Sequence, residues 1–237
     1  MYLSKTMAQS TIWEKEYRQP KLLAPTDKPQ KDTLNFFRYL RKKHSVRLED
    51  KPSILDIGSG NGRNANYLAE MGAEVSGIEI SQTALQIAKN AAQKKNVSVN
   101  YMLGSFGDTF RFPENFFDIA IDVTSSNSLD EAEREVYLRE LDRTLKPGGF
   151  FFLKTLCLDG DKNAKNLLKQ SPGPEKNTYN MEEIGLVERV FTRQEIVDLY
   201  SPHFEILELP KKESYTRMNN RSYKRLFWIG YMKHHRL

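Results

Sequence analysis

A chain of 237 residues is long enough for one α/β domain and short for two, so we expect a single hydrophobic core. Hydrophobic residues make up 39% of the chain, charged residues make up 28% and the net charge is +5; no apolar run reaches the roughly 18 residues of a spanning helix, which excludes a membrane-spanning protein. Cys157 is the only cysteine, which excludes an intrachain disulfide and a cysteine-based zinc site, and we expect no metal centre.

The amino-terminal segment differs from the rest of the chain. It contains three prolines and few apolar side chains, so we expect residues 1–30 to form an irregular arm ahead of a domain that spans residues 31–237. Trp13 and Tyr17 are four residues apart and would share one face of a helical turn, where they either close over a ligand as a lid or pack against the core. The chain does not begin with the apolar stretch of a secretory signal, and we expect a cytoplasmic protein.

From residue 53 onward, short apolar runs alternate with helical patterns, which predicts a parallel sheet covered by helices on both faces. The predicted strands of this sheet are Ser53–Ile57, Glu74–Ile80, Val97–Leu103, Phe117–Val123 and Phe150–Leu156. The predicted helices are Asp32–Lys43, Arg63–Met71, Gln82–Lys95, Glu131–Leu145 and Arg193–Tyr200, and three of them follow a capping Ser81, Asp130 or Thr192.

The alternation of strands and helices changes after the fifth strand. Residues 157–190 are longer than an ordinary strand-to-helix connection, and we expect them to cover the substrate side of the sheet. His203–Leu209 and Tyr223–Met232 then follow one another as strands without a helix between them, which predicts an antiparallel pair. Their connecting loop, residues 210–222, is expected at the same edge and forms a second part of the cover.

The strongest functional signal is a strand that runs into a glycine-rich turn and a helix, Leu55-Asp56-Ile57-Gly58-Ser59-Gly60-Asn61-Gly62. Glycines let the backbone turn sharply and approach a ligand closely, and the next helix offers unpaired N–H groups. Glu79 ends the second strand, where a carboxylate is placed to accept the ribose hydroxyls of a nucleoside. The dinucleotide fingerprint needs its third glycine where this chain has Arg63, so the spacing disfavours NAD.

The glycine-rich segment, Glu79 and the segment Leu145-Lys146-Pro147-Gly148-Gly149 resemble those of the class I S-adenosylmethionine-dependent methyltransferases. The resemblance implies a Rossmann-like, seven-stranded, mostly parallel sheet of order 3-2-1-4-5-7-6 with strand 7 antiparallel. It implies S-adenosylmethionine as cofactor and S-adenosylhomocysteine as product, and it covers about residues 31–237. Small-molecule members of this family often carry a similar W-x-x-x-Y segment as a lid.

The resemblance also implies roles for individual residues. The glycine turn wraps the methionine portion of the cofactor, Glu79 holds the ribose, and Ile80 and Phe106 lie against the adenine. The family often has an acidic residue where this chain has Ser105, so either Ser105 or Asp108 takes the adenine amino group. The implied cofactor-binding residues are Asp56, Gly58, Ser59, Gly60, Gly62, Glu79, Ile80, Ser105, Phe106, Asp122, Thr124, Trp13 and Tyr17.

A catalytic base is harder to identify than the cofactor residues. Asp122 ends the fourth strand and is the best-placed acid, either as a base or cofactor contact or as a cap of the loop that follows. The four histidines fall outside the loops at the carboxyl ends of the strands, where ligands bind in sheets of this kind.

Both ends of the chain are basic: residues 1–50 carry a net charge of +5, residues 211–237 carry +7, and the middle carries −7. We expect a methyltransferase with a small, anionic acceptor; the alternatives are an RNA or protein methyltransferase that uses the basic ends, and a non-catalytic binder of the cofactor. The candidate substrate-binding residues are Tyr215, Arg217, Arg221 and Tyr223. The alternative is that these residues only form the solvated tip of a hairpin. The oligomeric state is not predicted.

Overall fold

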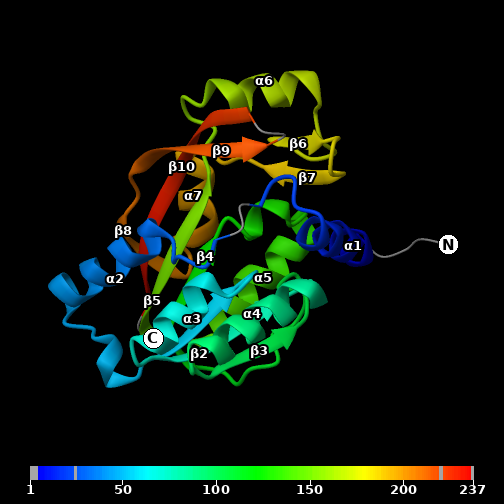
Figure 1. Cartoon of the computed structure of the whole chain (residues 1–237). Coiled ribbons are helices and arrows are strands. Elements are labelled where there is room, and N and C mark those ends of the chain that lie inside the picture. The colour runs from blue at the N-terminus through cyan, green and yellow to red at the C-terminus, as the bar shows by residue number, and fades with distance from the viewer. Residues whose placement is uncertain (1–4, 24–25, 219–220, 236–237) are drawn as a thin grey trace.

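The computed structural model describes residues 5–23, 26–218 and 221–235, and these residues form a central eight-stranded sheet of order β3-β2-β1-β4-β5-β10-β8, with β9 paired to β10 (Figure 1). Strands β1 to β5 run parallel, and β10 is antiparallel to both β5 and β8. The strands are β1 Ser53–Ile57, β2 Glu74–Glu79, β3 Val99–Leu103, β4 Phe117–Val123, β5 Leu145–Leu156, β8 Phe204–Glu208, β9 Lys211–Met218 and β10 Arg221–His234.

Helices cover both faces of this sheet because its central strands are apolar on both sides. Phe36, Leu68 and Leu85 of α2, α3 and α4 pack on one face, while Tyr137 and Ile196 of α5 and α7 pack on the other. None of the helices in the described part of the chain is long and apolar enough to cross a membrane. The helices are α1 Lys5–Arg18, α2 Lys31–His44, α3 Arg63–Glu70, α4 Gln82–Lys94, α5 Glu131–Thr144, α6 Lys162–Gln170 and α7 Arg193–Tyr200.

The predicted fold class is confirmed, and β10 and β8 take the places predicted for strands 7 and 6. The predicted count of seven strands was wrong, because β9 adds an eighth. Residues 210–222 were expected to be a loop, yet most of them belong to a hairpin in which β9 pairs with β10 from Lys211 to Met218. Strands β8 and β9 follow each other along the same edge of β10, on either side of Pro210.

Residues 5–18 form helix α1, where the sequence predicted an irregular arm. Pro20, which led to that prediction, lies after the helix and therefore does not interrupt it. The carboxylate of Glu16 closes the turn after α1 by accepting hydrogen bonds from the backbone N–H groups of Lys21, Leu22 and Leu23, at 2.8, 2.6 and 2.9 Å.

The long connection after β5 folds into α6 and a two-stranded sheet of β6 Thr178–Met181 and β7 Leu186–Arg189. In Figure 1, α6, β6 and β7 gather above the carboxyl end of β5, on the same side of the molecule as α1. Strand β7 packs against the short helix Ser126–Ser128 that follows β4. These elements therefore lie over the carboxyl edge of the sheet, and we call α6, β6 and β7 the cover.

Candidate functional site

The turn between β1 and α3 has a backbone that only glycine accommodates easily. Gly58, Gly60 and Gly62 have φ angles of +68°, +56° and +77°, in the left-handed region. A Cβ on Gly60 would collide with the hydroxyl of Tyr17, and a Cβ on Gly58 would collide with Ser125. The turn is therefore closely covered by α1 and by the loop after β4.

Asp56 lies under this turn with 2% of its surface exposed. Burial raises the pKa of Asp56 to about 7, while the Arg63 guanidinium and a hydrogen bond from the Ala65 backbone oppose the rise. Within the described residues, Asp56 Oδ2 and the nearby Ser59 Oγ have no hydrogen-bond partner although both are buried. Buried polar atoms are usually paired, so these two acceptors are suited to the donors of a ligand held by the turn.

Glu79 joins the end of β2 to the glycine turn. Its Oε2 accepts a hydrogen bond from Gly60 N at 2.9 Å, and its Oε1 accepts one from Ser81 N at 2.8 Å. Burial raises the pKa of the Glu79 carboxyl, and these backbone donors oppose the rise. The Ile80 backbone is a third donor, and since a carboxylate has about four lone-pair positions, Glu79 keeps acceptor capacity for a ligand hydroxyl.

Phe106, after β3, reaches toward the same turn: its Cε1 lies 3.3 Å from the position of a Cβ on Gly58. Ser105 is half-buried, and its Oγ accepts a hydrogen bond from Gly107 N at 3.0 Å. Asp108 is exposed, whereas Ile80 is half-buried at the end of β2. The structure thus brings Ser105, Phe106 and Ile80 to the carboxyl edge beside Glu79.

Asp122, at the carboxyl end of β4, has no exposed surface. Its carboxylate accepts hydrogen bonds from Ser125 N at 2.9 Å and from Tyr137 Oη at 2.9 Å, and Ser126 contributes further bonds. This environment favours the interpretation of Asp122 as the anchor of the loop after β4 over that of a base that meets the acceptor. Thr124 follows with a φ of +66°, which is a strained conformation for a β-branched residue. The next residue, Ser125, contacts the glycine turn by donating from its Oγ to Gly58 O.

Helix α1 crosses the carboxyl edge and touches several loops of the site. Glu14 accepts hydrogen bonds from Ser81 Oγ at 2.7 Å and from Thr83 N at 3.1 Å, at the beginning of α4. Gln9 Nε2 donates to Ser128 O at 2.7 Å, after β4. Burial raises the pKa of the Tyr17 hydroxyl, and the Glu79 carboxylate adds to the rise.

Helix α1 and the turn after it also contact the cover. Lys21 Nζ donates to Glu183 O at 3.1 Å, and Ile12 Cδ1 lies 4.0 Å from the position of a Cβ on Gly185. Trp13 is partly buried against the apolar cluster that includes Tyr179 of β6. Helix α1, which lies over the glycine turn through Tyr17, is thereby in contact with the cover on its other side.

The residues predicted to bind the substrate lie on the β9–β10 hairpin. Tyr215 is 67% exposed and Tyr223 is 37% exposed. The side chains of Arg217 and Arg221 lie outside the described part of the structure. The hairpin therefore offers exposed aromatic groups, but the structure does not bring Tyr215 or Tyr223 to the glycine turn.

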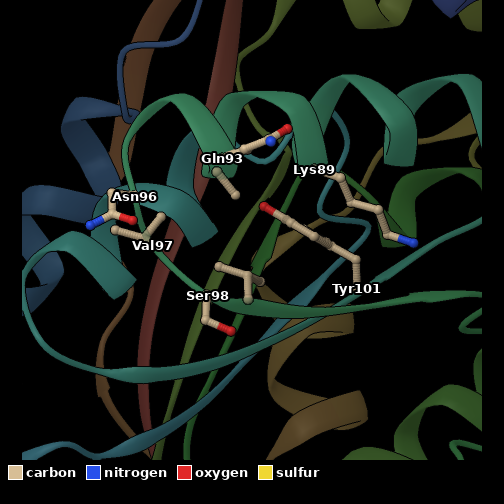
Figure 2. Close-up of a pocket in the computed structure, with 8 residues that line it drawn as sticks. Lys89, Gln93, Asn96, Val97, Ser98 and Tyr101 are labelled. Atoms are coloured by element: carbon tan, nitrogen blue, oxygen red, sulfur yellow. The ribbon is translucent and has the colours of Figure 1, made fainter.

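Two surface cavities lie away from this edge. The larger, about 470 Å³, lies between α4 and β3 and is lined by Lys89, Gln93, Val97 and Tyr101 among others (Figure 2). The smaller, about 360 Å³, lies near the amino ends of β4 and β5. Tyr101, which lines the larger cavity, is connected to the site through α3. Its hydroxyl donates to Oδ1 of Asn66 in α3 at 2.7 Å.

The histidines also lie elsewhere. His203 and His234 share the carboxylate of Asp142, at 3.0 and 2.9 Å, and His44 packs its ring against Phe150 near the amino end of β5. This arrangement agrees with their predicted position outside the site.

Sequence reasoning missed Glu14 and Ser125. Both act through contacts with distant segments, so no local motif marks them. In the sequence, Arg63 marks only the departure from the dinucleotide fingerprint. In the structure its side chain is half-buried and interacts with Asp56 and Tyr17 of the site.

Known proteins share this sequence pattern and fold. The methyltransferase domain family matches residues 55–153. A ubiquinone biosynthesis O-methyltransferase of Thiobacillus denitrificans is 34% identical over 123 residues, which are 52% of this chain and 50% of that protein. An uncharacterized methyltransferase of Schizosaccharomyces pombe is 33% identical over 104 residues, which are 43% of this chain and 70% of that protein. The chain belongs to the class I S-adenosylmethionine-dependent methyltransferases.

The crystal structure of an S-adenosylmethionine-dependent methyltransferase from Methanosarcina mazei agrees with this membership. Its TM-score is 0.69 at 26% identity, covering 79% of this chain and 94% of that one. The chain spans about half the length of the ubiquinone-biosynthesis relatives it matches. The cofactor of this methyltransferase family is S-adenosylmethionine, and the unpaired acceptors of Asp56 and Ser59, together with Glu79, fit its ammonium and ribose groups.

Proposed function

We propose that this methyltransferase transfers the methyl group of S-adenosylmethionine to a small acceptor that carries an anionic group. Enclosure of the carboxyl edge is the observation that supports a small acceptor. Helix α1 is bonded through Gln9 to the loop after β4, and Lys21, in the turn after α1, is bonded to the turn between β6 and β7. A polymer substrate needs an open edge, whereas a small molecule reacts inside such an enclosure.

The donors and acceptors around the glycine turn support a role in cofactor binding for each of the residues there. The glycine turn and Asp56 hold the methionine portion, and Glu79 accepts the ribose hydroxyls with its remaining lone pairs. Ile80 and Phe106 border the adenine, with Ser105 at its edge. Tyr17 closes the turn from above and adds a hydroxyl beside Glu79.

S-Adenosylmethionine supplies a methyl group bound to a sulfonium sulfur, and that sulfur is already activated as the leaving group. The protein's own contribution is therefore alignment of the acceptor and exclusion of water rather than covalent catalysis. Trp13 and Tyr17 of α1 exclude water from above the turn. Asp122 acts indirectly by fixing the loop that carries Thr124.

The names of the relatives support the same class of acceptor. The matched ubiquinone biosynthesis O-methyltransferases are named for methylation of an oxygen in the synthesis of a small molecule. Since the similarity spans about half of each of those proteins, it supports a small acceptor for this chain without naming one.

Labelled methyl transfer tests this proposal. The purified protein is incubated with methyl-labelled S-adenosylmethionine and, separately, with a pool of small carboxylic acids and phenols, with total RNA and with protein extract. We expect label in the small-molecule pool with a weak dependence on salt. Label in RNA that falls steeply with salt would contradict a small acceptor, and cofactor binding without transfer to any pool would favour the non-catalytic alternative.

A further inference from the structure

A largely buried group of charges lies on the α2 face of the sheet, and none of the cofactor roles uses it. Lys154 of β5 and Lys212 of β9 both form ion pairs with the carboxylate of Asp32 in the first turn of α2, the Lys154 Nζ to Asp32 Oδ2 distance being 2.8 Å. The side chains of Asp32 and Lys154 are only 8% and 11% exposed. We call these three residues the lysine pair site.

The lysine pair site has more positive charge and more donors than its carboxylate requires. Two ammonium groups pair with one carboxylate: the Lys212 side chain is 39% exposed and reaches solvent, whereas the Lys154 side chain is buried. Burial disfavours ionisation of Asp32, but the two ammonium donors outweigh it and lower the pKa of Asp32. Within the described residues, Lys154 donates one side-chain hydrogen bond, to Asp32, although a lysine ammonium carries three N–H donors.

The remaining N–H donors of Lys154 are costly to leave unpaired in this buried position. A buried charge is normally paired, and a structural ion pair would need a single lysine for Asp32. Lys154 Nζ lies 4.7 Å from the centre of the Phe227 ring, so its remaining donors border an aromatic surface. The site therefore combines a buried ammonium, which keeps N–H donors beyond its bond to Asp32, with an aromatic face, and both features suit an aromatic anion.

The position of the lysine pair site joins it to the cofactor turn. Thr124 N donates to Lys154 O at 2.8 Å, which sets Lys154 beside the strained residue after β4. On the other side, Gln30, two residues before Asp32, donates its N–H to Asn64 Oδ1 at 2.9 Å at the beginning of α3. The site is thus bounded by the two loops that flank the cofactor turn.

Phe227 connects the lysine pair site to the large apolar cluster on this face of the sheet. Phe227 belongs to the apolar cluster that contains Tyr179 and Leu186 of the cover, and Trp13 of α1 packs on the same cluster. Lys212 belongs to the hairpin strand β9 and pairs across it with Phe227. Strands β5, β9 and β10 and the first turn of α2 therefore border the lysine pair site.

We propose that the lysine pair site binds an anionic oxygen of an aromatic acceptor, with Lys154 as the principal donor. This inference rests on the proposed methyltransferase function and narrows its acceptor to aromatic acids and phenolates. An acceptor whose reacting oxygen is ionised needs no general base: an oxygen lone pair forms the bond to the methyl carbon, the carbon–sulfur pair returns to sulfur, and no proton moves. Lys154 is a positioning and binding residue in this account.

The experiment is a calorimetric titration with benzoate and, for comparison, with uncharged benzamide, each in the presence of saturating S-adenosylhomocysteine. We expect saturable benzoate binding that Lys154→Met weakens about tenfold or more, because a charge-assisted hydrogen bond is lost. Asp32→Asn should strengthen benzoate binding several-fold, because it removes the competing carboxylate. Benzamide binding should change by less than about twofold in both variants.

Lys211→Met provides the matched control. Lys211 is the neighbouring lysine on β9, and its Nζ lies over the Trp228 ring rather than near Asp32. The same loss of one positive charge there should leave benzoate binding unchanged, which separates a local effect from a change in net charge. Retained S-adenosylhomocysteine binding shows that each variant is folded.

The outcomes separate this inference from the proposed function. Failure of the wild-type chain to bind S-adenosylhomocysteine would overturn both. Binding of S-adenosylhomocysteine without benzoate binding, or benzoate binding that ignores Lys154→Met, would overturn the lysine pair site alone. A loss of benzoate binding in Asp32→Asn would also overturn it, because a structural ion pair predicts that sign and an anion site predicts the opposite.

Discussion

Glu14→Gln tests whether α1 is held over the site by the beginning of α4. The Glu14 carboxylate is desolvated in part, but its bonds to Thr83 and Ser81 outweigh this and lower its pKa from 4.5 to about 2. That shift corresponds to about 3 kcal/mol at most. Because 22% of the side chain remains exposed and solvent screens it, we expect about half, or roughly 1.5 kcal/mol.

The pH dependence of this contribution has a definite sign. The pKa of Glu14 is lower in the folded state than its ordinary value of 4.5, so its stabilisation is fully present above pH 4.5 and is lost as the pH falls toward 2. A glutamine mimics the protonated acid. The difference between the wild type and Glu14→Gln should therefore be largest at neutral pH and fall by more than half near about pH 3.

Native-state hydrogen exchange of the α1 amides measures this difference directly. Glu14→Gln should reduce their protection about tenfold at neutral pH, and about threefold or less near pH 3, relative to the wild type at the same pH. Glu114→Gln is the control, since Glu114 is exposed on the loop before β4. Equal protection in Glu14→Gln and the wild type, or a loss of protection that does not depend on pH, would show that the Glu14 carboxylate does not hold α1 against the beginning of α4.

Two further substitutions test the turn and its support. Gly60→Ala should destabilise the protein by about 1–2 kcal/mol, because the backbone at this position is left-handed. It should also weaken cofactor binding, because the added Cβ displaces Tyr17. Gly104→Ala is the control, since a Cβ there meets nothing within 4 Å, and it should change neither stability in denaturation nor cofactor binding in calorimetric titration. Tyr137→Phe removes a buried donor from Asp122 and should cost about 2 kcal/mol in urea denaturation; an unchanged midpoint would show that Asp122 does not depend on this bond.

The sequence predicted the parts of the site that depend on local order. The strand, turn and helix around Gly58 to Gly62 lie within a short segment, and Glu79 ends the next strand, so spacing alone was enough to place them together. The mostly parallel sheet followed from the family resemblance and is confirmed, although β9 adds a strand that the predicted order did not contain.

The parts that sequence could not predict depend on distant contacts. Helix α1 contains few apolar residues, and Glu14 fixes it to residues 67 and 69 positions away. Lys154 lies 122 positions from Asp32, and Lys212 lies 180 positions from it, so no spacing rule connects them. Strand β9 was missed because its side chains are mostly polar, and its pairing with β10 holds it in place.

Binding of S-adenosylmethionine and S-adenosylhomocysteine, measured by calorimetric titration, tests the central claim most directly, with NAD as the comparison ligand. Glu79→Gln and Glu74→Gln change opposite ends of β2, and Glu74 is exposed. We predict micromolar binding of both sulfur nucleotides, none of NAD, at least about tenfold weaker binding in Glu79→Gln, and unchanged binding in Glu74→Gln. Absence of binding to either sulfur nucleotide, or equal binding in the two variants, would contradict the account of the site.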